Sequence, residues 1–277
     1  MDLLDTLEAM PVRQQMLPGG ALLRYREAGS KAAGAPVLVL LHGIGSGSAS
    51  WVRQLVAADG GAQRVLAWDA PGYADSSGIM AHSPSSADYA ARFWLWMDAL
   101  EVDTVHLVGH SLGCIMAAGA LRAQPARVQR LCLLAPAQGY GTGTAEQRAK
   151  MCQERLGTFT RLGASGMAAL RAPALLTPSA SSGELDLATL MMSRLNLDGY
   201  TKATHLLANA VIANDLVGAT CPITVACGDQ DTVTPPKACQ ALADKLQAPY
   251  VNLPQAGHLC AVQAWTQVNQ LLGLGSV

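Results

Sequence analysis

Short apolar runs recur along the chain, and most are followed by a longer stretch with the apolar spacing of an amphipathic helix. Such runs are typical of strands that are buried on both faces and therefore need helices to cover them. We expect an antiparallel hairpin within residues 10–28, around Pro18-Gly19-Gly20, and strands near 37–42, 64–69, 104–110, 128–135, 222–227 and 249–253. We expect helices near 49–58, 86–100 and 112–123. The alternation predicts a doubly wound α/β fold.

The alternation stops in the middle of the chain. The pattern of residues 137–215 predicts helices only. Two of these helices are expected to begin at the capping boxes Thr144-x-x-Gln147 and Ser181-x-x-Glu184. We therefore expect an α/β core, formed by residues 1–136 and 216–277, and a helical cap that is inserted after the sixth strand. A cap above the sheet would exclude water from a pocket and shape it.

The five residues Gly109-His110-Ser111-Leu112-Gly113 follow the apolar run 105–108 and lead into an Ala-rich helical stretch. G-x-S-x-G on a strand-to-helix turn is the pattern of a nucleophile elbow. In so tight a turn, side chains two residues before and after the serine would collide with neighbouring backbone, so both positions favour glycine. The pattern predicts Ser111 as a catalytic nucleophile.

A serine hydroxyl needs a base within hydrogen-bond reach, and that base needs a carboxylate to fix its tautomer. Both residue types follow predicted strands: Gly228-Asp229-Gln230-Asp231 comes after one, and Gly257-His258 comes after the next. Active sites on open parallel sheets form at these carboxyl ends of strands. We expect His258 as the base and Asp231 or Asp229 as the acid.

A further element lies upstream, where the apolar run 37–41 ends in His42-Gly43-Ile44-Gly45-Ser46-Gly47. The pattern is typical of an oxyanion loop, in which backbone N–H groups stabilise the negative oxygen of a tetrahedral intermediate. We expect the N–H groups of Ile44 and Leu112 to be the donors. His42 is interpreted as a structural residue that shapes the loop.

Together, the motifs from His42 to His258 resemble those of the α/β-hydrolase superfamily and cover most of the chain. The resemblance implies an eight-stranded, mostly parallel sheet with a helical cap, and the chain order nucleophile, acid, histidine. It favours Asp231, the last acid of G-D-x-D, over Asp229. The turn that begins at Asp69 also resembles a family motif, but we assign it no catalytic role.

Composition narrows the class of protein. The chain has 277 residues and a formal net charge of −1, and 14% of its residues are charged. Without a basic cluster there is no electrostatic footprint for nucleic acid, and no apolar run approaches the ~18 residues that a membrane span needs. The low charged fraction leaves apolar surface for a small-molecule substrate or a homo-oligomer interface.

Localisation and cofactors are predicted from the N-terminus and the cysteines. Asp2 and Asp5 stand where a secretory signal carries basic residues, and no apolar segment follows, so we expect a cytoplasmic protein. The seven cysteines form neither a C-x-x-C pair nor a zinc-like spacing, and we interpret them as mostly buried thiols. Cys114 lies close enough to Ser111 to contact a substrate, although packing is the favoured interpretation. We expect no metal and no cofactor.

The residue at the elbow sets the expected reaction. Haloalkane dehalogenases and epoxide hydrolases of the superfamily use an aspartate there, whereas this chain has Ser111. The resemblance therefore implies a serine hydrolase that cleaves a carboxylic ester or lactone through an acyl-enzyme. The alternative from another class is a non-catalytic ligand receptor on the same fold.

A second enzymatic alternative is carbon–carbon bond hydrolysis of aromatic ring-cleavage products. The segment from His42 to Trp51 resembles the H-G-x-G-P-G-A-x-x-W loop of the hydrolases that catalyse it. Ser46 and Ser48 replace the Pro and Ala of that loop. Leu259 stands where those enzymes commonly carry a tryptophan after the histidine.

Substrate-binding residues are predicted on the cap and in the loop. Arg194 is the candidate for a substrate carboxylate, because guanidinium groups bind carboxylates through two parallel hydrogen bonds. Met191 and Trp51 complete the predicted substrate-binding set. Further apolar cap residues expected near the pocket are Phe159, Met167, Met192 and Leu195.

Overall fold

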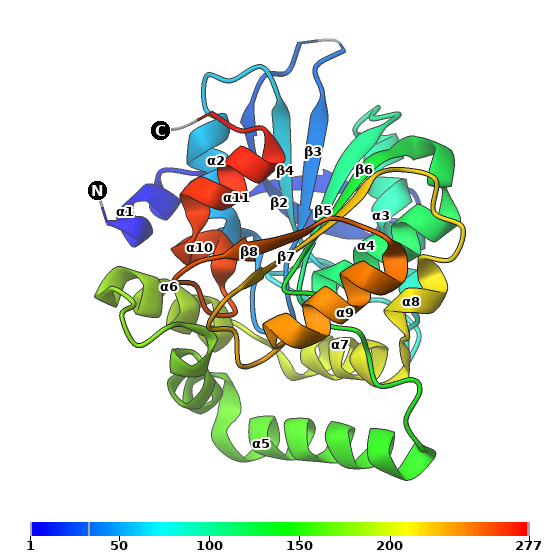
Figure 1. Cartoon of the computed structure of the whole chain (residues 1–277), viewed down its shortest axis with the longest axis vertical. Coiled ribbons are helices and arrows are strands. Elements are labelled where there is room, and N and C mark those ends of the chain that lie inside the picture. The colour runs from blue at the N-terminus through cyan, green and yellow to red at the C-terminus, as the bar shows by residue number, and fades with distance from the viewer. Residues whose placement is uncertain (1, 33, 276–277) are drawn as a thin grey trace.

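The computed structural model describes residues 2–32 and 34–275, and its centre is an eight-stranded sheet (Figure 1). The strands are β1 (Arg13–Met16), β2 (Leu22–Gly29), β3 (Val37–Leu41), β4 (Arg64–Asp69), β5 (Val105–His110), β6 (Val128–Leu134), β7 (Ile223–Gly228) and β8 (Tyr250–Leu253). The α-helices are α1 (Leu3–Glu8), α2 (Val52–Ala58), α3 (Ser86–Ala99), α4 (Leu112–Ala123), α5 (Ala145–Arg171), α6 (Ser182–Ser193), α7 (Leu197–Asn209), α8 (Ile212–Asp215), α9 (Pro236–Leu246), α10 (Cys260–Gln263) and α11 (Trp265–Leu272). The 3₁₀ helices are η1 (Ser48–Trp51), η2 (Pro125–Arg127) and η3 (Pro173–Leu175).

The strand order across the sheet is β1-β2-β4-β3-β5-β6-β7-β8. The strands from β4 to β8 in this order pair in parallel, whereas β2 pairs antiparallel with both β1 and β4. The predicted hairpin is confirmed, and Gly19 and Gly20 at its turn have φ values of 84° and 82°, which suit glycine. The expected mostly parallel, eight-stranded α/β sheet is therefore confirmed.

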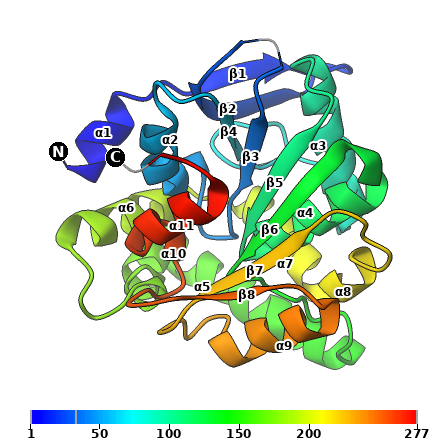
Figure 2. The same cartoon turned by 45° about the horizontal axis from the view of Figure 1, so that its top comes forward.

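Helices cover both faces of the sheet, which explains why its strands are apolar on both sides. The helices α2 and α11 lie on one face, and α3, α4, α8 and α9 lie on the other (Figure 2). In β3 and β4, residues 38–41 and 65–68 are at most 2% exposed. Each Å² of apolar surface removed from water contributes ~25 cal/mol, so continuous apolar runs are favoured in such strands.

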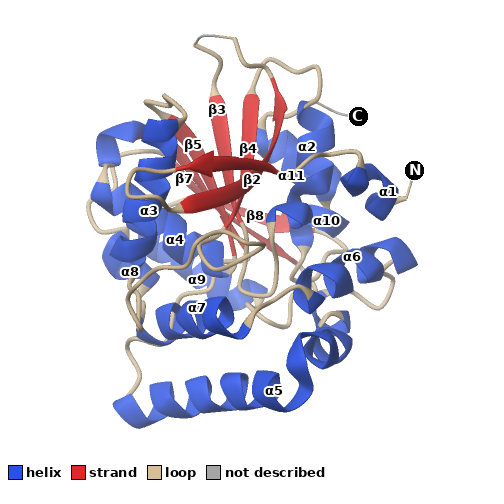
Figure 3. Cartoon of the chain, turned by 180° about the vertical axis from the view of Figure 1, so that it is seen from behind, coloured by secondary structure: helices blue, strands red, loops and turns tan. Residues whose placement is uncertain are grey.

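Every regular element between the end of β6 and the start of β7 is helical, as predicted. Both capping boxes are present: the Thr144 hydroxyl accepts from the Gln147 N–H at 3.2 Å, and the Ser181 hydroxyl accepts from the Glu184 N–H at 3.3 Å. The longest helix, α5, runs along one end of the molecule (Figure 3). Neither α5 nor any other helix of residues 2–32 and 34–275 is long and apolar enough to cross a bilayer. The separation of residues 137–215 as a cap domain stays a prediction.

Polar and apolar contacts attach these helices to the core. At the start of α7, the Asn196 side chain donates a hydrogen bond to the Gly72 carbonyl at 2.6 Å. On α6, Leu187 belongs to an apolar cluster with Leu7 of α1 and Val262 of α10. The contacts hold the helices over the carboxyl ends of the strands, where they form one wall of a cavity.

Candidate active site

Ser111 occupies the turn between β5 and α4. Its φ of 52° and ψ of −118° are values that residues other than glycine rarely adopt, and such strain is concentrated at functional sites. The turn needs glycine on both sides, because a Cβ at Gly109 would lie 2.5 Å from Cys114 Cα. A Cβ at Gly113 would lie 2.1 Å from the Leu41 carbonyl oxygen. These close approaches are the steric reason for the G-x-S-x-G pattern.

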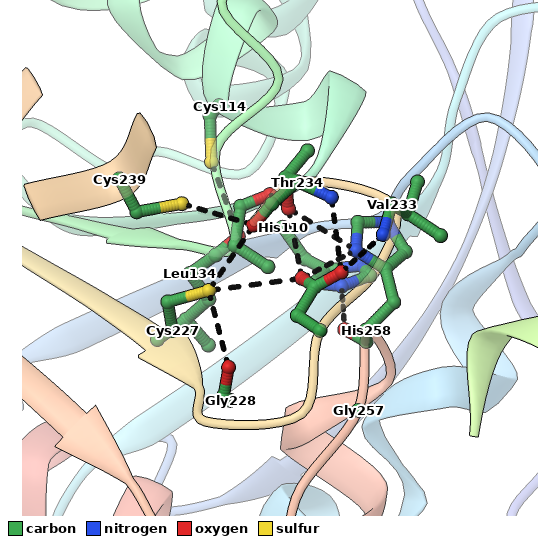
Figure 4. A network of polar contacts seen from close by, with 12 residues as sticks. His110, Cys114, Leu134, Cys227, Gly228, Val233, Thr234, Cys239, Gly257 and His258 are labelled. Atoms are coloured by element: carbon green, nitrogen blue, oxygen red, sulfur yellow. Dashed lines mark hydrogen bonds and ion pairs between the residues drawn. The ribbon is translucent and has the colours of Figure 1, made fainter. Parts of the chain in front are cut away.

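Asp231 and His258 follow β7 and β8, and the fold brings their side chains together. His258 Nδ1 lies 2.9 Å from Asp231 Oδ2, and both side chains are almost fully buried. Figure 4 shows the polar network around His258, including the backbone N–H groups of Val233 and Thr234, which donate to Asp231 Oδ1 at 2.7 and 2.9 Å. Because Nδ1–H faces the carboxylate, Nε2 of the neutral ring is the nitrogen that can accept a proton.

The environment keeps Asp231 in its charged form. Burial acts to raise the pKa of Asp231, but the hydrogen bond and charge of His258, with hydrogen bonds from Thr234, outweigh burial and lower the pKa below its ordinary value. Asp229 is exposed and makes none of the hydrogen bonds to His258 in the described part of the chain. The structure therefore places Asp231, and not Asp229, against the imidazole.

The residues Ile44 and Leu112 line the same cavity as Ser111. Among residues 2–32 and 34–275, neither backbone N–H has a hydrogen-bond acceptor, and Leu112 is the first residue of α4, where helix N–H groups are unpaired. The Tyr73 hydroxyl donates to the Ile44 carbonyl at 2.8 Å and so fixes that residue. Two unpaired N–H groups that share a cavity with a serine are candidates for an oxyanion hole.

Buried polar contacts hold the loop after β3. His42 Nδ1–H donates to the Gly43 carbonyl at 2.8 Å, and Nε2 accepts from the Ala70 N–H at 3.0 Å. The Asp69 carboxylate accepts from the backbone N–H and the hydroxyl of Ser48, at 2.7 and 2.9 Å. Burial lowers the pKa of His42, so the ring stays neutral and Nε2 can accept. Both side chains thus hold the loop, which is the role predicted for His42, whereas the contacts of Asp69 with Ser48 were not predicted.

His110, the residue before Ser111, supports the loop that carries His258. Its Nε2–H donates to the His258 carbonyl at 2.7 Å, and the centroids of the two imidazole rings lie 4.9 Å apart. Burial, followed by repulsion from His258, lowers the pKa of His110 to about 3. His110 is therefore a neutral ring at physiological pH.

A cavity of about 240 Å³ lies between the elbow and the helices of residues 137–215. Ser111 and His258 line it, together with the two oxyanion candidates. Its apolar walls include Met167, Leu175, Met192, Leu195, Leu207 and Val233. Phe159 was also expected here, but its ring instead stacks on that of Tyr200, with the centroids 5.2 Å apart. The size of the cavity suits a small substrate, and these walls suit its apolar part.

The structure corrects the predicted substrate-binding set, because Arg194, Met191 and Trp51 do not line this cavity. Trp51 is fully buried, with its ring edge-on to that of His110 at 6.4 Å between centroids. Met191 and Arg194 line an adjoining cavity of about 70 Å³, which shares two lining residues with the larger one. Successive helix residues point ~100° apart, so turning Met192 toward the larger cavity turns Met191 away from it.

Polar residues that the sequence did not reveal do line the cavity. Arg155 and Arg171 reach it from α5, although arginine on a helix is usually solvated. The one signal in the sequence is the set of three glycines between them, at positions 157, 163 and 166, because glycine inside a helix often marks a bend. Thr234, whose hydroxyl lies 3.2 Å from His258 Nδ1, belongs to no motif that would have indicated it.

The cysteine nearest to the elbow packs behind the site. The thiol of Cys114 is fully buried, lies 3.1 Å from the Gly109 carbonyl and does not line the cavity. Burial raises the pKa of the Cys114 thiol, which makes it an inert packing residue. Within residues 2–32 and 34–275, no group of three or more His, Cys, Asp or Glu side chains is arranged to hold a metal ion.

Sequence comparison agrees with this geometry at the level of the family. A sequence model described as alpha/beta hydrolase fold matches residues 36–263, a range that contains the elbow, the acid and the histidine. The chain belongs to the α/β hydrolase fold family. A hydrolase of known structure from Pseudomonas aeruginosa PA01 is similar to this α/β hydrolase over 95% of the chain and 98% of its own, with 27% identity and a TM-score of 0.79.

Curated relatives of this α/β hydrolase have names that refer to different reactions. A 2-hydroxy-6-oxononadienedioate/2-hydroxy-6-oxononatrienedioate hydrolase from Dechloromonas aromatica (strain RCB) is 35% identical over 138 residues, which are 48% of this chain and 44% of the relative. The dihydrolipoyllysine-residue acetyltransferase component of the acetoin cleaving system from Pseudomonas putida is 28% identical over 271 residues, which are 94% of this chain and 68% of the relative. The match thus spans less than half of the first relative and about two thirds of the second.

The neutral His110 should make the protein less stable in acid. An unfolded histidine binds a proton near pH ~6.5, whereas the folded state holds the pKa of His110 at about 3. Between these values the unfolded state binds more protons, so the free energy of unfolding falls as the pH is lowered from about 6.5. When the pH is lowered from about 6.5 to about 4.5, the free energy of unfolding should fall by about 2 kcal/mol more in the wild type than in His110→Gln. Urea unfolding of both proteins at each pH measures this difference. If the free energies of unfolding of the two proteins changed in parallel with pH, the prediction would be wrong, because His110 would then take up its proton in the folded state as well.

Proposed function

We propose that this α/β hydrolase is a serine hydrolase that cleaves a carboxylic ester or lactone of a small organic molecule. The observation that carries the proposal is the convergence of Ser111, His258 and two unpaired backbone N–H groups on one cavity, with a buried carboxylate behind the histidine. Relationship to the α/β hydrolases supports hydrolysis as the reaction class. A serine nucleophile would form an acyl-enzyme.

In the proposed reaction, Ser111 Oγ attacks the carbonyl carbon while His258 Nε2 takes the hydroxyl proton. The carbonyl oxygen becomes an oxyanion on the N–H groups of Ile44 and Leu112. His258 gives its proton to the departing alkoxide, and the acyl group stays bound to Ser111 as the acyl-enzyme. His258 then deprotonates a water molecule that attacks the acyl group, and the serine recovers its proton as the acid departs. Asp231 stays ionised and stabilises the charged imidazole.

Carbon–carbon hydrolysis is the second candidate, because one relative is named a hydrolase of 2-hydroxy-6-oxononadienedioate. That name describes an enol of the kind formed by ring cleavage. Ser46, Ser48 and Leu259 depart from the pattern of such enzymes. The two cavity arginines would suit a carboxylate in either reaction, so they do not decide between the candidates.

Two other functions, acyl transfer and ligand binding without turnover, are compatible with the same cavity. An acyl-enzyme that reacts with an alcohol or thiol in place of water would transfer an acyl group, the class of reaction in the name of the Pseudomonas putida relative. A ligand receptor would bind without turnover. We favour hydrolysis because the cavity lining offers a candidate for the nucleophile, the base and the oxyanion donors. Product analysis with and without an added alcohol separates hydrolysis from transfer.

Ser111→Ala should lower kcat/KM for a p-nitrophenyl ester by several orders of magnitude, because the nucleophile is lost while the fold remains. Far-UV circular dichroism would verify that the variant is folded. A fluorophosphonate probe should label the wild type once, at Ser111, as peptide mass spectrometry would show. Full activity of Ser111→Ala, or labelling of a different serine, would contradict the proposal.

Asp231→Asn should lower kcat for the same ester by up to about 10⁴-fold, because an amide in place of the carboxylate favours the wrong tautomer of His258. Asp229→Asn is the matched control, since it lies on the same loop but is exposed. It should stay within about twofold of the wild type. If steady-state kinetics gave the reverse ranking, Asp229 would take the role of the acid.

Simple esters or lactones should be hydrolysed with kcat/KM at least about tenfold above that of a 2-hydroxy-6-oxo-dienoate. Carbon–carbon cleavage must first convert the dienol to its keto form, and this needs a site built to bind the dienolate. Release of p-nitrophenolate and loss of the dienolate absorbance measure the two reactions. Faster cleavage of the dienoate would replace ester hydrolysis as the function.

A further inference from the structure

Two arginines reach the cavity from one bent helix. Arg155 and Arg171 are 16 positions apart on α5, a separation of about 24 Å along a straight helix. Both nevertheless line the same cavity, because Gly163 leaves the helical conformation between them, with φ 65° and ψ 179°. The later part of α5 turns back toward the core (Figures 1 and 3). The bend converts two distant positions into neighbours.

The two guanidinium groups have no countercharge. In the described part of the chain, neither forms a hydrogen bond or an ion pair with another side chain, and no Asp or Glu lines the cavity. Arg64, Arg122 and Arg127, in contrast, each form an ion pair with a carboxylate. Half-buried positive charge without a countercharge has lost part of its hydration, and a bound anion would compensate for that loss.

The two charges are also close enough to repel one another. Burial lowers the pKa of Arg171, and the positive charge of Arg155 lowers it further. An anion bound between them would remove this repulsion. A carboxylate matches the planar donor pair of a guanidinium and is the anion that such a site accommodates best.

Tyr200 adds an uncharged donor to the lining of the same cavity. Its side chain is 1% exposed and lines the cavity, and its hydroxyl has no hydrogen-bond partner among residues 2–32 and 34–275. The stack on Phe159 of α5 fixes the ring. A buried hydroxyl without a partner is unfavourable, so it is an independent sign that a polar ligand group belongs there.

We propose that Arg155, Arg171 and Tyr200 form a carboxylate-binding site, and that the substrate is an ester or lactone with a second, free carboxylate remote from the scissile bond. The inference rests on the proposed hydrolase function, because the reacting carbonyl must lie at Ser111 while the carboxylate lies at the cap wall. The role predicted for Arg194 passes to these residues. The carboxylate can belong to the acyl part or to the alcohol part of the ester, and separate substrates distinguish the two.

The kinetic test compares each anionic ester with its neutral methyl ester. Mono-p-nitrophenyl glutarate carries the carboxylate on the acyl side, and 4-acetoxybenzoate carries it on the alcohol side. In one of the two pairs, the wild type should show kcat/KM about 10- to 100-fold higher for the anion, as expected for charged hydrogen bonds. Arg155→Gln and Arg171→Gln should each remove most of this preference through a higher KM, while neutral esters stay within about twofold.

Arg161→Gln is the matched control, because Arg161 is exposed on the same helix. Arg194→Gln is a second control, because Arg194 lines a different cavity. Both controls should keep the preference for the anion. Equal kcat/KM for anionic and neutral esters in both pairs would overturn the carboxylate site while leaving the hydrolase function intact. The carboxylate site would also be overturned if Arg161→Gln lost the preference for the anion as fully as Arg155→Gln and Arg171→Gln.

A binding measurement separates the site from the reaction. Glutarate, which cannot be hydrolysed, should raise the Tm of the wild type and of Arg161→Gln, because a ligand stabilises the state that binds it. It should leave the Tm of Arg171→Gln unchanged. No shift in the wild type at about 10 mM glutarate would overturn the site even if esters are cleaved. A shift without turnover of any ester would support the site and contradict the hydrolase function.

Discussion

The sharp turn between β5 and α4 is the constraint on which the rest of the site depends. It presents Ser111 at the carboxyl edge of the sheet and directs the first N–H of α4 to the same place, but it requires a positive φ. The chain can pass there only because Gly109 and Gly113 have no side chains. The buried strand and helix on either side hold the strained residue, so the core sets the position of the serine.

Around this turn, burial and hydrogen bonding sort the polar groups by charge. Asp231 stays negative because several donors surround its carboxylate, and His110 stays neutral because burial disfavours its charged form. In the same cavity lining, Arg155 and Arg171 bring positive charge from α5. The same cavity thus holds a candidate proton acceptor, His258, and an unbalanced positive charge. Its apolar walls strengthen both effects by excluding water.

The sequence by itself determined the features that depend on residues close together in the chain. Strand positions follow from apolar runs, and the capping boxes follow from residues three positions apart. The elbow follows from the steric limits of a single turn, which Gly109 and Gly113 satisfy. The choice of Asp231 over Asp229 needed the family pattern as well, because both acids follow the same strand.

Only the tertiary structure decided which side chains face the cavity. Arg194 and Met191 were expected there and line a smaller cavity, whereas Arg155 and Arg171 were missed and line the larger one. The direction of a helical side chain depends on how its helix rotates against the core and on where the helix bends. Packing against distant segments fixes the rotation, and the bend at Gly163 changes the outcome over the whole of α5. Neither the rotation of a helix nor its bend is encoded in the residues next to an arginine, so the local pattern could not reveal that Arg155 and Arg171 line the cavity.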